Sequence, residues 1–200
     1  MSWIQTISYT EAKGKLKRIY DRIKGPNNSL DHVLSIHSLR PHTLEGHMVL
    51  YKSVLHHSGN SLPKWYLECL GTYVSKLNAC DYCETHHGVG LKRQLNNDEK
   101  YDALRSAMEN NSFEGVLTEK EIAGVQHAVQ LTCNHSDIKE ADIQYLRSHG
   151  YTDGEILEIN QVVCYFNYVN RMVVGLGVAI ETDHIGLSPN SSDSDDWSHQ

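Results

Sequence analysis

The sequence predicts an all-α protein, and three features of the chain lead to this prediction. Apolar residues recur at intervals of three and four, which is the period of an amphipathic helix. Strand signals are nearly absent, because no Asn-Gly turn is flanked by residues that alternate between apolar and polar. Capping and turn-forming residues divide the chain into segments of helical length.

The first half of the chain is expected to form four helices, each separated from the next by turn formers. Pro41 suits the first turn of the second helix, and Ser61 and Asn78 are candidate caps for the third and fourth. The clearest breaks, rich in Gly, Asn and Ser, fall at residues 25–29, 58–61 and 96–98. With their caps, the expected helices cover residues 10–23, 41–55, 61–77 and 78–95.

The second half carries two complete capping boxes. Residues 118–121 and 152–155 both read Thr-x-x-Glu, a pattern that satisfies two backbone amides at a helix start. Gly150 suits the left-handed position at the end of an intervening helix. The last helix has one broad apolar face, so it is expected to be a core helix that ends at residues 175–177, Gly-Leu-Gly.

The composition of the chain indicates its domain organisation and excludes some classes of partner. One helical domain is expected over residues 1–187, followed by an acidic, Ser-rich tail at 188–200 that is too polar to fold and is expected to be disordered. The net charge of -7 argues against a nucleic-acid partner, which requires clustered Lys and Arg. A leader-like start and long apolar runs are absent from the sequence, so a cytoplasmic protein without a membrane partner is expected.

Cysteine usage indicates where chemistry takes place. The sequence has five cysteines, and Cys69, Cys133 and Cys164 lie in periodic apolar segments where a thiol is expected to act as a small hydrophobic group. Cys80 and Cys83 form a Cys-x-x-Cys, which in a reducing compartment is more often catalytic or metal-binding than structural. This pair is therefore the first candidate for a functional site.

A helix that starts at Asn78 would align the cysteine pair with an imidazole. Cys80 would lie in the first turn, and Cys83 and His87 would share a face at a spacing of four residues. The positive end of the helix dipole favours a thiolate at Cys80, whereas a nearby imidazole favours one at Cys83. The residues alone therefore leave open which thiol is the nucleophile.

Glu68 adds a carboxylate to this set if two helices form a hairpin. Glu68 and His87 are equidistant from a turn between residues 77 and 78, so antiparallel helices would place them side by side, whereas one continuous helix would separate them by roughly 28 Å. A carboxylate beside the imidazole would orient its ring and stabilise its protonated form. The sequence thus predicts a nucleophile, a base and an orienting acid.

The spacing Glu-x11-Cys-x2-Cys-x3-His resembles that of the AhpD-like alkylhydroperoxidases, a branch of the carboxymuconolactone decarboxylase family, and is formed by Glu68, Cys80, Cys83 and His87. Further stretches resemble the peroxidase-related subfamily, at residues 35–41, 77–83, 165–171 and 175–177. The resemblance covers nearly the whole chain except the tail. It implies an all-α helical bundle that assembles into homo-oligomers.

The resemblance also implies a cofactor-free antioxidant peroxidase with a redox-active disulfide. Cys83 would attack the hydroperoxide and become a sulfenic acid, and Cys80 would resolve it to a disulfide. An external dithiol, on a lipoyl-bearing or thioredoxin-like protein, would then reduce the disulfide. His87 would act as the base and Glu68 as the proton relay.

Two positions depart from the best-known members of the family. Tyr82 stands between the cysteines where those members have histidine, and His86 is an additional imidazole expected to point away from the face of Cys83 and His87. The proton relay is therefore expected to differ. The polar cluster at residues 167–171 is expected to be buried with local partners, and it is given no catalytic role.

Three alternatives remain open from the sequence. Cys80, Cys83, His87 and Glu68 are acceptable zinc ligands, although three of the four would come from one helix. A lactone decarboxylase of the same superfamily is disfavoured, because such members typically lack the cysteine pair. A non-catalytic, redox-sensing oligomer, in which the disulfide changes assembly, is compatible with every residue named.

Overall fold

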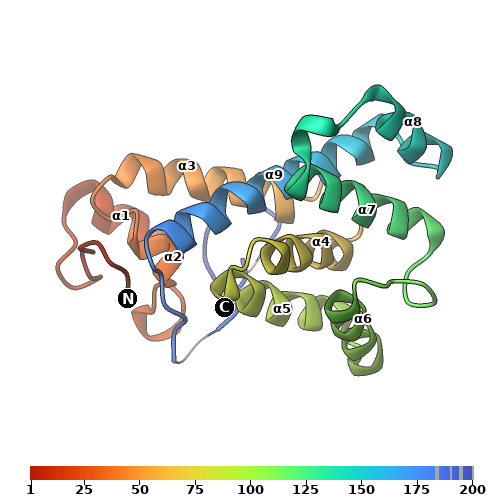
Figure 1. The fold of residues 1–200 in the computed structure, drawn as a ribbon. Coiled ribbons are helices and arrows are strands. Elements are labelled where there is room, and N and C mark those ends of the chain that lie inside the picture. The colour runs from red at the N-terminus through yellow and green to blue at the C-terminus, as the bar shows by residue number, and fades with distance from the viewer. Residues whose placement is uncertain (183–184, 190, 194–195, 200) are drawn as a thin grey trace.

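The computed structural model describes residues 1–182, 185–189, 191–193 and 196–199, and within these residues it is helical without strands (Figure 1). The predicted all-α fold is confirmed. Short 3-10 or π segments cover Pro26–Asn28, Lys52–His56 and His135–Asp137. The helices are α1 Gly14–Ile23, α2 His32–Ser35, α3 Pro41–Tyr51, α4 Lys64–Leu77, α5 Asp81–Leu95, α6 Asp98–Asn110, α7 Glu119–Cys133, α8 Glu140–Ser148 and α9 Asp153–Gly175.

The core is built around α4, which packs against α5, α7 and α9. Every residue of α4 from 66 to 75 is buried, so this helix is enclosed on all sides. The apolar face predicted for the last helix is confirmed, because Ile159, Val163 and Phe166 of α9 are fully buried. A second, smaller cluster joins α1 to α3. None of the helices in the described residues is long and apolar enough to cross a bilayer.

The turn between α4 and α5 differs from the predicted one. Asn78 ends α4 instead of capping the next helix, Ala79 takes the left-handed conformation (φ 51°), and Cys80 is the N-cap of α5. The amides of Ala79 and Cys80 donate to the carbonyls of Lys76 and Ser75, which is the Schellman pattern of a helix end. Because alanine occupies the position that glycine usually takes, this helix ending could not be predicted from the residue types.

Two other helix starts were also displaced. The first helix begins at Gly14 and not at Thr10, because the Ser8 amide and hydroxyl bind the Glu11 carboxylate and fold this stretch into turns. Ser61 does not cap α4, because the N-cap is Pro63, and the Ser61 amide donates to Glu158 of α9. Both capping boxes are present as predicted, and Gly150 has the expected positive φ of 83°.

A close helix crossing lies at Gly71 of α4. A Cβ atom at this position would lie 2.1 Å from the buried ring of Phe166 on α9. We therefore expect Gly71→Ala to lower the free energy of unfolding by about 1–3 kcal/mol, the usual cost of overpacking. Gly46 of α3 has open space around it, so Gly46→Ala should instead stabilise by about 0.5–1 kcal/mol. Urea denaturation measures the free energy of unfolding of both variants. Equal changes in this free energy would contradict the close packing at Gly71.

The segment after α9 returns along α5 and lies against the helices. Trp197 is 5% exposed and packs into the cluster of α1 and α3, although the polar composition of 188–200 predicted disorder. The indole ring of Trp197 buries a large apolar surface, which the average composition of the segment does not reveal. Residues 190, 194–195 and 200 of this predicted tail lie outside the described part, and the boundary at 187 stays a prediction.

Candidate active site

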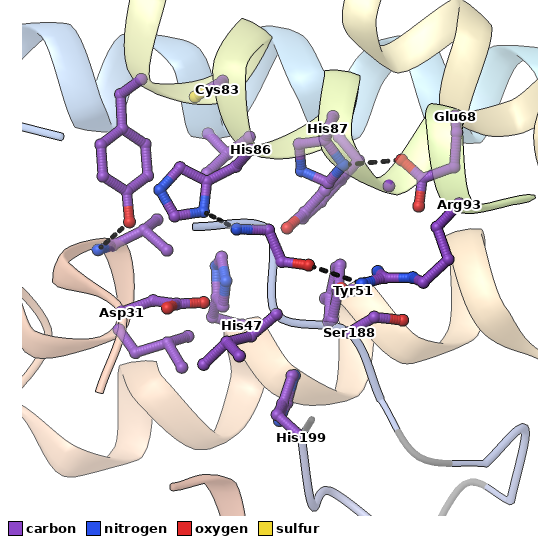
Figure 2. A pocket seen from close by; sticks show the side chains of 18 residues that line it. Asp31, His47, Tyr51, Glu68, Cys83, His86, His87, Arg93, Ser188 and His199 are labelled. Atoms are coloured by element: carbon purple, nitrogen blue, oxygen red, sulfur yellow. Dashed lines mark hydrogen bonds and ion pairs between the residues drawn. The ribbon is translucent and has the colours of Figure 1, made fainter. Parts of the chain in front are cut away.

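A cavity of about 50 Å³ lies between α3, α5 and the segment after α9 (Figure 2). Of the four predicted site residues, Glu68, Cys83 and His87 line this cavity, whereas Cys80 does not. Glu68 comes from α4 and the other two from α5, so the hairpin brings them together as the spacing predicted. His47 and Tyr51 of α3 lie on the opposite side of the cavity.

The contact predicted between Glu68 and His87 is present. His87 Nδ1 donates to Glu68 Oε2 at 2.8 Å, as the dashed line in Figure 2 marks. Since a carboxylate only accepts, this hydrogen bond leaves Nε2 of the neutral imidazole as its proton acceptor. The ring is also fixed by an edge contact to Phe166, at 4.5 Å between centroids. Gly90 makes room for the acid, because a Cβ there would lie 3.2 Å from the Glu68 carboxyl.

Glu68 is 4% exposed, and two opposing effects set its acidity. Burial raises the pKa of the carboxyl, but the charge and hydrogen bond of His87 outweigh burial, so the pKa of Glu68 lies below its usual value. Glu68 is therefore ionised at neutral pH, and the imidazole has a carboxylate beside it. This arrangement stabilises the imidazolium that forms when the ring accepts a proton.

The lowered pKa of Glu68 predicts a pH dependence of stability. A carboxyl with a depressed folded-state pKa stabilises the fold above its unfolded value, about 4.5, and this contribution is lost as the pH falls through the folded value. The difference in free energy of unfolding between wild type and Glu68→Gln should therefore shrink as the pH falls below 4.5. Urea denaturation across pH 3–7 measures it, and a pH-independent difference would contradict an ionised Glu68.

The two thiols of the Cys-x-x-Cys are in direct contact. Their Sγ atoms lie 2.7 Å apart, both side chains are buried, and neither is in a disulfide. The hydrogen bond with Cys83 lowers the pKa of Cys80, and the hydrogen bond with Cys80, together with burial, raises the pKa of Cys83. When the pair loses its first proton, the thiolate that forms accepts a hydrogen bond from the remaining thiol. The first pKa therefore belongs to the pair and not to one cysteine.

The two cysteines face different sides of α5. Cys83 lines the cavity beside His87, whereas Cys80 lines a separate groove of about 300 Å³ between the start of α5 and the end of α9. The α9 side of that groove is mostly apolar and includes Val174 and Ile180. Within the described residues no hydrogen bond joins the His87 ring to either sulfur, so proton transfer between them requires a water or the substrate. The cavity therefore borders Cys83, and the groove borders Cys80.

A buried polar network lies behind the thiols, and the sequence reasoning missed its role. Asn170 of α9 is 1% exposed, and its side-chain amide donates to Ser75 Oγ while its carbonyl accepts from Asn78. Its side chain also lowers the pKa of both Cys80 and Cys83, so a neutral amide supports negative charge on the pair. The unusual polar cluster at 167–171 was the available signal. The prediction of burial with local partners holds in part: Arg171 and Asn167 bind locally but Arg171 is exposed, whereas the buried Asn170 binds residues of α4 and its C-cap.

His86 was expected to point away from the site, and this expectation is wrong. The side chain is 8% exposed and lines the cavity, stacked on Tyr82 with 4.3 Å between ring centroids. The Gly186 amide donates to His86 Nδ1, so Nε2 carries the proton and donates to Glu181 at 2.7 Å. The Tyr82 hydroxyl donates to the same carboxylate at 2.8 Å. Tyr82 and His86, the two positions that depart from the family pattern, thus both bind the carboxylate of Glu181, which follows α9.

Glu181 carries its negative charge at neutral pH. Burial raises its pKa, but hydrogen bonds from His86, Tyr82 and the His32 amide outweigh burial and bring that pKa down to about 2. Both ring nitrogens of His86 form hydrogen bonds within the protein, so this imidazole has no free nitrogen to accept a proton from a substrate. The role of base in the cavity therefore falls to His87.

The wall opposite α5 is aromatic and uncharged. His47 is 5% exposed, and burial lowers its pKa to about 3, so its ring is neutral at pH 7. Its Nδ1 atom is buried without a hydrogen-bond partner among the described residues. Tyr51 and Tyr165 complete this wall, and burial raises the pKa of both hydroxyls well above the usual value. On this wall a small polar molecule would therefore meet neutral hydrogen-bonding groups, while Asp31 and Arg93 also line the cavity.

The remaining cysteines differ from one another. Cys69 is buried in α4, and burial raises its pKa to about 12, as expected for a packing thiol. Cys133 and Cys164 are exposed, which corrects the expectation that they pack as hydrophobic groups. No group of three or more His, Cys, Asp or Glu side chains in the described residues is placed to hold a metal ion. The zinc-ligand arrangement considered from the sequence is therefore not formed.

Comparisons with known proteins agree with this description. No family model and no curated protein sequence matches the chain. An uncharacterized peroxidase-related protein from Ralstonia eutropha JMP134, described as an alkylhydroperoxidase AhpD core, is similar over 90% of this chain and 93% of its own, with a TM-score of 0.78 and 19% identity. An uncharacterized peroxidase-related protein from Silicibacter sp. TM1040 is 25% identical over 75% of this chain and 76% of its own, with a TM-score of 0.66.

A third similar structure is the debrominase Bmp8, which is 16% identical over 90% of this chain and 91% of its own, with a TM-score of 0.70. Proteins described by different activities thus share this arrangement of helices, so the fold alone does not fix the reaction. The likeness to the peroxidase-related structures agrees with the resemblance read from the cysteine, histidine and glutamate spacing. The chain therefore has the AhpD-like helical fold.

Proposed function

We propose that the protein is a thiol-dependent peroxidase that reduces small hydroperoxides through Cys83 and Cys80. The observation that carries this proposal is the placement of Cys83, which lines an enclosed cavity together with a hydrogen-bonded His87 and Glu68. A nucleophile, a base and a group that orients the base are the parts that covalent catalysis by a thiol requires. Glu68 and Cys83 are buried and His87 is partly buried, so contact of the three with bulk water is limited.

In the first step, the Cys83 thiol passes its proton to His87 through a water molecule or through the substrate. The thiolate attacks one oxygen of the hydroperoxide, forming the S–O bond as the O–O bond breaks. The sulfur is oxidised to a sulfenic acid, and the leaving hydroxide or alkoxide takes the proton from His87. Glu68 stabilises the imidazolium between these two transfers, because it stays ionised.

In the second step, the Cys80 thiol attacks the sulfenic sulfur, a disulfide forms, and water leaves. The 2.7 Å contact between the sulfurs supports this step, since little movement is needed to join them. An external dithiol then reduces the disulfide, and the apolar groove at Cys80 offers it an approach separate from the peroxide cavity. A lipoyl-bearing or thioredoxin-like protein has the required chemistry, and a homo-oligomer is the assembly we propose.

Turnover of peroxide with a small dithiol tests the proposed function. The wild-type protein should consume many equivalents of hydrogen peroxide when dithiothreitol is present, and about one equivalent when it is absent. Cys164→Ser, which removes an exposed thiol outside the site, should behave like wild type. A protein that consumes no peroxide beyond the dithiothreitol background would sink the peroxidase proposal and favour a redox-sensing role.

A further inference from the structure

One wall of the Cys83 cavity is built by chain that follows α9. Gly186, Leu187, Ser188 and His199 line the cavity, and Figure 2 shows Ser188 and His199 on its side away from α5. The described residues 185–189, 191–193 and 196–199 are called the closing segment here. Without this wall, the cavity would open on the side of His47 and Tyr51. The enclosure that keeps the cavity at about 50 Å³ therefore depends on the closing segment.

The first part of the closing segment is fixed tightly to α5. Gly186 donates its amide to His86 Nδ1 at 3.2 Å and accepts from Arg93 Nη1 at 3.0 Å. A Cβ on Gly186 would lie 2.6 Å from Val89, and its φ is 74°, so only glycine fits this close approach. Just before it, the ionised Glu181 is bound by His86. This part is a permanent piece of the site.

The second part is held by contacts of another kind. Lys52 is 2% exposed, and its ammonium donates to the carbonyls of Ser191 at 2.8 Å and of Asp196 at 2.5 Å. Trp197 is inserted beside α1, with the guanidinium of Arg22 at 3.8 Å from its ring. The His199 ring lies 6.2 Å from that of Tyr51 and nearly parallel to it. Two anchors thus place the His199 ring at the cavity.

Lys52 joins the helical core to the second part of the closing segment by hydrogen bonds. While the closing segment covers it, the Lys52 ammonium needs the carbonyl oxygens that the segment supplies, because a buried ammonium without partners would be strongly unfavourable. If the segment moved away, the Lys52 ammonium would reach water, and the loss would be limited to the contacts of Trp197 and His199. The wall is therefore detachable without unfolding the helical core.

We propose that the closing segment sets the substrate range of the site, restricting the Cys83 cavity to hydrogen peroxide and small alkyl hydroperoxides and excluding aryl and long-chain ones. The inference rests on the proposed function for its substrates. Its physical basis is size: about 50 Å³ of space holds only a few atoms beyond a peroxide group, since one water needs about 10–15 Å³ by the same measure. Detaching His199 and Trp197 extends the cavity along Tyr51.

The test compares wild type with a variant that ends at Pro189 and with the full-length variant Lys52→Met. Lys52→Met keeps the apolar stem but removes the ammonium that binds the segment, and Lys64→Met, an exposed lysine on α4, is its matched control. For each protein, kcat/KM is measured with hydrogen peroxide and with cumene hydroperoxide. The ratio of cumene hydroperoxide to hydrogen peroxide should rise about tenfold or more in the truncated protein, rise in Lys52→Met, and stay unchanged in Lys64→Met.

A second measurement separates this inference from the proposed function. The reduced proteins are alkylated with iodoacetamide and with a bulky aryl maleimide, and modification of Cys83 is followed by peptide mass spectrometry. Both altered forms should gain reactivity toward the maleimide relative to iodoacetamide. If the alkylation ratio rises but no form reduces a peroxide, the closing segment stands and the peroxidase proposal fails. If both ratios match wild type in the truncated protein and in Lys52→Met, the proposed role of the closing segment is overturned.

Discussion

Replacing Cys83 by serine should reduce hydroperoxide turnover to the background rate, a loss on the order of 10⁴-fold or more, as when an enzyme loses its nucleophile. The cavity holds only this thiol of the pair, so no other described cysteine can take its place at the substrate. Serine fills nearly the same volume, and the fold should remain intact. Stopped-flow consumption of hydrogen peroxide, with thermal denaturation as a check on folding, measures both effects.

Cys80→Ser is the informative partner of this variant. It should still consume one equivalent of peroxide, because Cys83 can form a sulfenic acid without its neighbour, but it should not turn over normally with a dithiol. Trapping of the sulfenic acid with a dimedone reagent should label Cys83 in this variant. If Cys80→Ser lost the first reaction and Cys83→Ser kept it, the assignment of the two thiols would be reversed.

Replacing Glu68 by glutamine should lower kcat/KM by about 10²–10⁴-fold, the range associated with general acid–base catalysis. Glutamine can present its NH₂ group to His87 Nδ1 and so favour the wrong tautomer, and it cannot stabilise an imidazolium. The effect should fall on the rate of the first oxidation and not on the reduction of the disulfide by dithiol. Single-turnover kinetics with hydrogen peroxide, over a range of pH, measure it.

Glu84 provides the control for this variant. It lies on α5 and forms an ion pair with Arg105 at 2.6 Å, away from the cavity, so Glu84→Gln should leave the peroxide rate unchanged. A structural role of Glu68 would lower stability without altering the pH profile of the rate. Equal rates in wild type and Glu68→Gln would rule out the proposed relay.

The part of the site that the sequence predicted depends on local geometry. The positions of Glu68 and His87 follow from one helical hairpin, whose centre could be placed even though the helix starts at Asp81 and not at Asn78. Helix spacing of four residues likewise fixed the face of Cys83. Capping boxes were reliable because both of their hydrogen bonds are formed within four residues.

The part that could not be predicted comes from contacts between distant segments. His86 is turned toward the cavity by Glu181, 95 positions later in the chain, and the amide of Asn170 reaches Ser75 across the same separation. Periodicity shows that such residues are on a helix but not which loop or helix covers them. The acidic composition of residues 188–200 likewise does not show that Trp197 packs into the cluster of α1 and α3.

The central claim, that Cys80 and Cys83 form one redox couple, is tested most directly by disulfide mapping. The reduced protein is treated with one equivalent of a small organic hydroperoxide, its remaining thiols are alkylated, and its peptides are analysed by mass spectrometry. We expect loss of two thiols per peroxide and a Cys80–Cys83 disulfide, with Cys69, Cys133 and Cys164 alkylated as before. Full retention of the Cys80 and Cys83 thiols, or oxidation that joins other cysteines, would contradict it.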